Sequence, residues 1–363
     1  MTRSDPLREA YSRAESIASR DLNNLYLTSR FFADPVRYRA FCAFYAVMRR
    51  VDDRVDELCA RSGVPAAERE RVAAEVAAWR RAVEAVDRGR PPGGTLAAVG
   101  DPTAAGELLA AFADAHGRFR VPLALWRNFF AAMDRDLEDR RFESYGEFLE
   151  YAEGATVAPT TIYLLLLTSR PAGAPAADPA HGPAPPPGGS ERARYEPLPG
   201  FDFLECGRQL GLFAYLTHIL RDLPQDLAAG ERGLIYLARD DMARFGVTEA
   251  TLRRDLARRR AGEGARALLA ELGGRARTHL ERGRALLADL EAELSADCAF
   301  ILALIVAIYD EALARIAAQG FDPFPERHRL GLREKRRIVA RTAREAGFPL
   351  AAVVGGVVAG GRR

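Results

Sequence analysis

Apolar residues recur every three to four positions along most of the chain, and runs that alternate apolar with polar residues are few. The first spacing is that of one face of an α-helix, whereas alternation is typical of a β-strand. Ala, Leu, Arg and Glu dominate these stretches, and all four favour helices. The pattern therefore predicts an all-α protein.

The helices expected from this pattern fall into two groups, separated by a stretch without periodicity. Pro35 and Pro122 suit the first turn of a helix, and Thr248 is a suitable N-cap. The expected ranges are Pro6–Phe31, Pro35–Cys59, Ala66–Arg88, Ala105–His116, Pro122–Arg140, Tyr145–Thr168, Phe203–Leu227, Glu249–Arg260, Ala265–Leu287, Glu291–Gln319 and Leu332–Ala346.

The separating stretch, Pro171–Gly200, is rich in Pro, Gly and Ala and offers little to bury. We expect a disordered surface insertion there and not a domain linker, because the same helical style resumes after it. The prediction is one helical domain over residues 1–346, interrupted at 171–200, with a flexible C-terminal tail at 347–363.

Charge and cysteine content narrow the class of protein. Lys and Arg total 52 against 50 Asp and Glu, a net charge of +2, which argues against a nucleic-acid partner. The four cysteines form no C-x-x-C pair, and no segment has the roughly 18–20 consecutive apolar residues of a membrane span. We expect a cytoplasmic protein. The apolar stretch Phe348–Gly361 leaves peripheral membrane contact open as an alternative to a loose tail.

The first candidate motif is acidic and lies near the end of the predicted helix Pro35–Cys59. Asp52 and Asp56 are four residues apart, which places both carboxylates on one helix face. Arg49 precedes them by one turn, and the aromatic and branched residues before them indicate a largely buried helix. The carboxylates are therefore expected to face a lined space.

The second motif repeats this arrangement about 170 residues later. Asp222 and Asp226 form the same pair after another apolar helix, again with an arginine, Arg221, directly before them. Pro224 lies between the two aspartates and suggests that the helix ends or kinks there.

Paired carboxylates on two helices suit the binding of hard divalent cations. Mg²⁺ prefers oxygen ligands and is often held by one or two carboxylates together with substrate phosphates. Arginines beside such a site can bind phosphate oxygens bidentately. One such pair alone is usually part of a solvated helix face; two pairs, each preceded by arginine and an apolar helix, favour a diphosphate site.

With these motifs the chain resembles the squalene/phytoene synthase family, whose members join two prenyl diphosphates head to head. The similarity covers roughly Asn23 to Lys335 without the insertion. It rests on the two acidic motifs, on Asp136-Leu137 with Tyr151, on Ile235-Tyr236-Leu237, and on the C-terminal segment with Tyr309, Gly320-Phe321-Asp322 and Arg327.

The resemblance implies a class I isoprenoid synthase fold, a helical bundle around a central cavity. It implies that Asp52, Asp56, Asp222 and Asp226 bind Mg²⁺, with Mn²⁺ as an alternative, and that Tyr309 serves the reaction. Substrate contacts are expected from Arg49, Arg221, Tyr45, Tyr215, His218 and Arg327.

Two positions depart from the family pattern, which usually has Gln and Asn where this chain has Tyr215 and His218. His218 is expected to donate a hydrogen bond or to act as a nitrogen ligand, which Mg²⁺ disfavours. These changes suggest a divergent member.

The expected reaction condenses two farnesyl or geranylgeranyl diphosphates to a C30 or C40 product such as phytoene, dehydrosqualene, squalene or presqualene diphosphate. The use of NADPH stays open. A terpene cyclase or another prenyl transfer on the same fold is one alternative, and a non-catalytic helical partner subunit is the other.

Overall fold

The computed structural model describes residues 5–20, 23–61, 63–91, 96–138, 141–173, 193–229, 235–288, 290, 293–325 and 330–349. Within these ranges the chain is built from helices and one short strand pair, as the periodicity predicts. No helix among them is both long and apolar enough to cross a bilayer. The cysteines Cys42, Cys59, Cys206 and Cys298 are all free.

The N-terminal half of the protein supplies one wall of the bundle. Its helices are α1 (Pro6–Ala18), α2 (Asn24–Ser29), α3 (Pro35–Cys59), α4 (Ala66–Asp87), α5 (Pro102–Phe119) and α6 (Leu123–Leu137). The helix expected over Pro6–Phe31 is in fact two helices. Asn23 begins the second, because its side chain accepts a hydrogen bond from the amide of Tyr26 at 2.9 Å.

The centre of the bundle is formed by α7 (Tyr145–Ala152), the π-helical segment η1 (Glu153–Val157), α8 (Ala158–Thr168) and α9 (Phe203–Ala228). The continuous helix expected over Tyr145–Thr168 is thus interrupted by a π-turn. At Gly154, in that turn, a Cβ atom would clash with the carbonyl of Asn128 in α6. Glycine therefore permits close approach of the two backbones.

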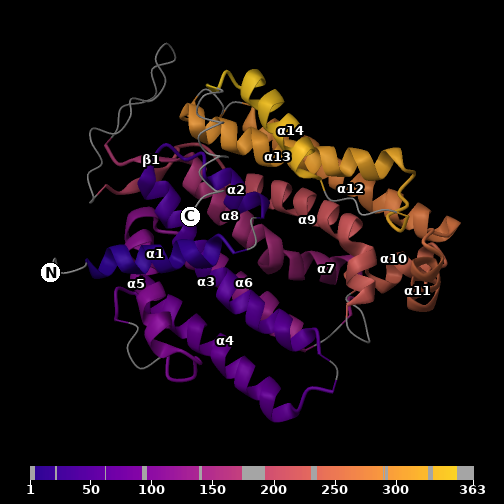
Figure 1. Ribbon diagram of the computed structural model, residues 1–363, viewed down its shortest axis with the longest axis horizontal. Helices are drawn as coiled ribbons and strands as arrows, with labels where there is room; N and C mark the ends of the chain where they lie inside the picture. Colours follow the sequence, from indigo (N-terminus) through magenta and orange to yellow (C-terminus); the bar gives the residue numbers. More distant parts are fainter. Residues whose placement is uncertain are drawn as a thin grey trace.

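The C-terminal half completes the bundle with α10 (Arg239–Arg244), α11 (Glu249–Arg258), α12 (Glu263–Leu287), α13 (Ala296–Ala318) and α14 (Leu332–Glu345). The short helix α10 was not expected from the sequence. Figure 1 shows α3 and α6 on one side of α8 and α9, with α12, α13 and α14 on the other, and α9 packs against α8, α12 and α13.

Both ends of the Pro171–Gly200 stretch are structured. Strand β1 (Ser169–Pro171) pairs antiparallel with β2 (Tyr195–Pro197). Tyr195 is buried, and its ring stacks on Phe119 with centroids 4.4 Å apart. The expectation of a wholly disordered insertion therefore fails at its ends, because an aromatic residue anchors β2 to α5. Residues 174–192 lie outside the described residues.

The start of the predicted tail is also packed. The Phe348 ring stacks on Phe300 of α13 with centroids 4.4 Å apart. The rest of the tail, residues 350–363, lies outside the described residues, so its predicted flexibility remains a prediction, as does the single-domain boundary.

Candidate active site

The first acidic motif lies in the second half of α3. Val47, Val51 and Val55 of this helix are buried in the bundle, which turns the intervening polar side chains toward a cavity. Asp52 and Asp56 both line that cavity, as their spacing predicts. Arg49 lies one turn before them and lines the same space.

The second motif lies near the end of α9. This helix continues through Pro224 to Ala228, one residue beyond its expected limit at Leu227, so of the end or kink suggested by the proline the end does not occur there. Asp222 and Asp226 therefore keep helical spacing, and both line the same cavity as the α3 carboxylates. Tyr215, His218 and Arg221 reach this cavity from the preceding turns of α9.

A polar cavity of about 750 Å³ thus brings most of the predicted residues together. It is lined by both carboxylate pairs and by Arg49, Arg221, Tyr215, His218 and Tyr309. Tyr45 lies one layer behind, where its hydroxyl accepts a hydrogen bond from Asn23, a lining residue. Arg327 lies outside the described residues.

The cavity also contains side chains to which sequence reasoning gave no role. The Tyr151 hydroxyl lies 2.9 and 3.1 Å from the two carboxylate oxygens of Asp136. Tyr236 and Lys335 line the same space. Asp136, Tyr151 and Tyr236 belong to segments that resemble the family, and Lys335 is the only lysine of the chain. These were the available signals, but none of them indicated a position in the cavity.

Electrostatics differ from those of an ordinary surface acidic patch. Loss of solvation raises the pKa of Asp52 to about 7, and the neighbouring charge of Asp56 adds to the shift. Burial likewise raises the pKa of Asp136 to about 7 and raises that of Asp56. Although 37% of the Asp52 side chain is accessible, it lines the cavity and does not lie on the open surface. The positive charge near these carboxyl groups does not offset their loss of solvation, so their protonated forms are favoured more than in an exposed aspartate.

The two arginines preceding the motifs bind motif aspartates. Arg49 contacts Asp52 at 3.3 Å and Asp53 at 2.7 Å. Arg221 donates to both carboxylate oxygens of Asp222, at 2.9 and 2.6 Å. Each guanidinium is thus held at the cavity wall, within reach of the space between the helices.

His218 completes the α9 side of the site. Its Nε2 lies 3.1 Å from a carboxylate oxygen of Asp222, and its Nδ1 lies 3.1 Å from a terminal nitrogen of Arg221. Because a guanidinium only donates, Nδ1 accepts and Nε2 carries the proton. The ring therefore bridges the arginine and the aspartate.

The donor set fits a divalent cation of the Mg²⁺ type. Two helices present carboxylate oxygens to one cavity, and several of these carboxyls have pKa values that nearby positive charge would lower. Among the described residues, no three His, Cys, Asp or Glu side chains lie close enough to hold an ion by themselves. Water and phosphate oxygens commonly supply the other ligands of Mg²⁺.

An apolar cavity of about 240 Å³ adjoins the polar one. Four residues line both: Ala155, Tyr215, His218 and Tyr309. Mostly apolar side chains of α8, α9 and α13 form its other walls, together with Leu25 of α2. Among these, Tyr163 is fixed by a 3.0 Å hydrogen bond to Thr28 of α2. The polar cavity could hold the polar head of a ligand, and the adjoining apolar cavity could hold a long apolar tail of the same ligand.

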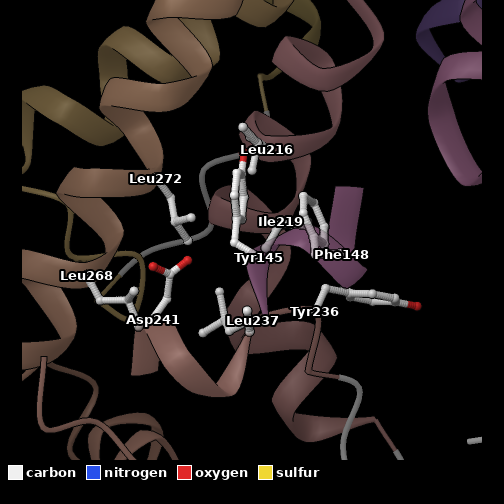
Figure 2. Close-up of a pocket in the computed structure, with 10 residues that line it drawn as sticks. Tyr145, Phe148, Leu216, Ile219, Tyr236, Leu237, Asp241, Leu268 and Leu272 are labelled. Carbon is white, nitrogen blue, oxygen red and sulfur yellow. The ribbon is translucent and has the colours of Figure 1, made fainter. Parts of the chain in front are cut away.

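Tyr236, shortly before α10, lines the polar cavity. Figure 2 shows its ring directed away from the other side chains that line a small cavity of about 10 Å³, among them Asp241 and Tyr145. Arg275 of α12 binds both oxygens of Asp241 at 2.6 and 2.8 Å, and its guanidinium lies 4.0 Å from the Tyr145 ring centroid. This buried contact anchors α10 to α7 and α12. It thereby also fixes the residues between Tyr236 and α10.

These features agree with the relationships found by comparison. The family model for squalene/phytoene synthases matches residues 20–338, and the chain belongs to this family. Chloroplastic phytoene synthase 1 of Zea mays is 24% identical over 245 residues, covering 67% of this chain and 48% of that protein. The 15-cis-phytoene synthase of Synechococcus elongatus is 25% identical over 248 residues, covering 68% and 66%.

Solved structures show the same fold. A dehydrosqualene synthase in complex with a ligand superposes with a TM-score of 0.67 at 20% identity, covering 95% of this chain and all of that one. Squalene synthase HpnC from Alicyclobacillus acidocaldarius gives a TM-score of 0.62 at 20% identity, covering 88% and 97%. The helical isoprenoid synthase fold is confirmed. The chain spans about half the length of the plant relatives.

Proposed function

We propose that this protein is a prenyltransferase that condenses two prenyl diphosphates head to head in a Mg²⁺-dependent reaction. The observation that carries the proposal is the pair of adjoining cavities. The polar one has two carboxylate pairs and two arginines, and it meets an apolar one at Tyr215, His218 and Tyr309. This division matches a substrate with a polyanionic head and a hydrocarbon tail.

The chain's own residues would bind the diphosphate and hold its cations. Asp52 and Asp56 from α3, and Asp222 and Asp226 from α9, are the candidate Mg²⁺ ligands. When bound, Mg²⁺ would neutralise the diphosphate and favour ionisation of the adjacent C–O bond. Arg49 and Arg221 would exchange part of their contact with the motif aspartates for diphosphate oxygens, a bidentate geometry that guanidinium favours.

The wall between the cavities would surround the reacting carbon atoms. Loss of diphosphate from one substrate would leave an allylic cation, which the double bond of the second substrate attacks. The cation so formed would lose a proton to give a cyclopropylcarbinyl diphosphate. Water would quench the allylic cation, so the apolar walls serve to exclude it. Burial raises the pKa values of Tyr215 and Tyr309. Their hydroxyls therefore remain protonated and can donate hydrogen bonds to the diphosphate.

The substrates we propose are farnesyl or geranylgeranyl diphosphate, and the product a C30 or C40 hydrocarbon or presqualene diphosphate. The test incubates the purified protein with Mg²⁺ and each diphosphate, with and without NADPH, and analyses the products by mass spectrometry. A C30 or C40 product supports the proposal. Cyclic C15 or C20 products alone would replace it with a terpene cyclase, and no turnover would favour a partner subunit.

A further inference from the structure

Helix α14 concentrates positive charge in a nearly neutral protein. Its sequence, LREKRRIVARTARE, has six cationic residues and two glutamates within 14 positions, whereas the whole chain has a net charge of +2. The excess on this one helix therefore exceeds that of the entire protein, and acidic residues elsewhere balance it.

The charge is gathered on the outer face of the helix. Ile338, Thr342 and Ala343 are buried, and α14 packs on α13. At 3.6 residues per turn the opposite side presents Arg333, Arg336, Arg337, Arg341 and Arg344, all of them exposed. We call these five residues the α14 basic face.

Most of this basic face is not neutralised by neighbours. Arg341 lies 3.4 Å from Glu311. The other four arginines form no ion pair with any residue that the structure describes. Of the two glutamates, Glu334 is engaged by Arg315 and accepts a hydrogen bond from the Gly331 amide at 2.7 Å.

Apolar groups lie next to the basic face. Leu332, at the start of α14, is 63% exposed, and the only other exposed large hydrophobic residue among those described is Leu204. After α14, the chain passes Phe348, whose ring stacks on Phe300 of α13. A helix whose basic face adjoins an exposed apolar residue, here Leu332, is typical of a membrane-surface element.

The position of α14 connects this surface with the reaction cavity. Lys335, on the inner side of the helix, lines the polar cavity together with Leu330. Beneath α14, α13 contributes Leu302, Ile305 and Val306 to the apolar cavity. The basic face thus lies on the outer side of helices that enclose the site, and Figure 1 shows α14 at the edge of the bundle over α13.

We propose that the α14 basic face docks the protein onto a bilayer that carries anionic lipids. The arginines would bind lipid phosphates and Leu332 would enter the interface, placing the cavity walls beside the membrane. The charge and exposure of α14 do not depend on the proposed reaction. Only the benefit of docking, which is transfer of an apolar product into lipid, rests on the proposed function. A nucleic acid fits less well, because it would leave Leu332 exposed.

Sedimentation with vesicles tests the docking without any substrate. The full-length protein is mixed with phosphatidylcholine vesicles, or with vesicles in which about a third of the lipid is phosphatidylglycerol. We expect binding to the anionic vesicles, weakened by salt, and little binding to the neutral ones. The triple variant Arg333→Gln, Arg337→Gln, Arg344→Gln should lower the partition coefficient on the order of a hundredfold, from a few-fold per charge near the surface.

A matched control removes the same charge elsewhere. Arg254, Arg258 and Arg260, in and directly after α11, are exposed and belong to a second arginine-rich segment. The triple Gln variant of these residues should keep most of the binding. Circular dichroism melting checks that both triple variants fold, and the single variant Leu332→Ser gives a milder second test, with a loss of a few-fold.

Three results would overturn the proposal: no binding of the wild-type protein to anionic vesicles, equal losses in the α14 and α11 variants, or binding to a single-stranded oligonucleotide but not to vesicles. The assay also separates the two proposals. Product formation in detergent without vesicle binding would refute the docking proposal and support the proposed function. Vesicle binding without turnover would support the docking proposal and refute the proposed function.

Discussion

The two acidic motifs have the same spacing but differ in how their charge is compensated. On α3, Asp52 and Asp56 lie near Asp136, with Arg49 as the nearby counter-charge, and their pKa values are raised. On α9, Asp222 is only 6% exposed and is bound by both Arg221 and His218. The negative charge of the α3 half is only partly compensated, whereas that of Asp222 in the α9 half is compensated by residues of the protein itself. The two halves should therefore respond differently to the same change.

The largest effect is expected from removing one carboxylate of either pair. Asp52→Asn and Asp222→Asn should each lower turnover about 10³-fold, comparable to the loss of one key electrostatic contact in other enzymes. Glu57→Gln, an exposed position on α3, is the matched control and should retain activity. Steady-state kinetics with the proposed substrates measures all three, and full activity of both Asn variants would refute the assignment of these carboxylates.

The same two variants should change stability in opposite directions. Asp52→Asn removes a charge from a repulsive cluster, so its melting temperature without metal should rise. Asp222→Asn leaves Arg221, whose side chain is only 16% exposed, without its carboxylate. This should cost about 1–3 kcal/mol in the free energy of unfolding. Shifts of the same sign in the two melting curves would mean that the halves do not differ as described.

The stability of the metal-free protein should depend on pH through the α3 half. The folded-state pKa of Asp52 is about 7, above the ordinary value near 4, so the folded state binds more protons between these values. Stability without metal should therefore rise as pH falls from 8 to 6. Mg²⁺ should raise the melting temperature more at pH 8, where it does not compete with protons. Equal protection at both pH values would contradict the assignment.

Exchanging each arginine for lysine should show a smaller difference between the halves. Arg221→Lys loses the paired donors that reach Asp222 and, in the proposed complex, the diphosphate. We expect kcat/KM to fall about 10- to 100-fold. For Arg49→Lys, kcat/KM should fall less, because the contact between Arg49 and Asp52 is longer, at 3.3 Å, and contributes less. A larger loss for Arg49→Lys would reverse the comparison.

The smallest effect is expected at His218. Its side chain is 47% exposed, and it contributes hydrogen bonds that an amide can partly replace. His218→Asn, which restores the residue usual in the family, should change kcat/KM about threefold, within the range of one neutral hydrogen bond. His218→Ala, which offers no donor or acceptor, should lose more. If Asn and Ala behaved alike, the bridge between Arg221 and Asp222 would have no role in turnover.

Much of the fold was predictable because helix-forming sequence is local information. The expected α3 matches at both ends, and α9 ends within one residue of its expected limit. The errors arose where capping or packing decided. Asn23 divides the first helix, the approach of Gly154 to α6 accompanies a π-turn, and Tyr195 anchors a strand that composition assigned to disorder.

The candidate site was predictable to the extent that its residues share a helix. Asp52 with Asp56, and Asp222 with Asp226, are related by the fixed geometry of one turn, so the chain itself determines that each pair acts together. The separation of the two pairs by about 170 residues carries no such information. Only the packing of the bundle brings α3 and α9 to the same cavity.

The tertiary structure also decided the charge state and extent of the site. Asp136 from α6, Tyr236 after α9 and Lys335 from α14 reach the cavity because helices distant in sequence pack around it. The raised pKa of Asp52 depends on burial and on neighbouring carboxylates, which no spacing rule provides. Residue order thus determined the carboxylate pairs and the arginines, because helical neighbours are local. Packing decided which half of the site lacks positive charge, because solvation and long-range contacts exist only in the folded protein.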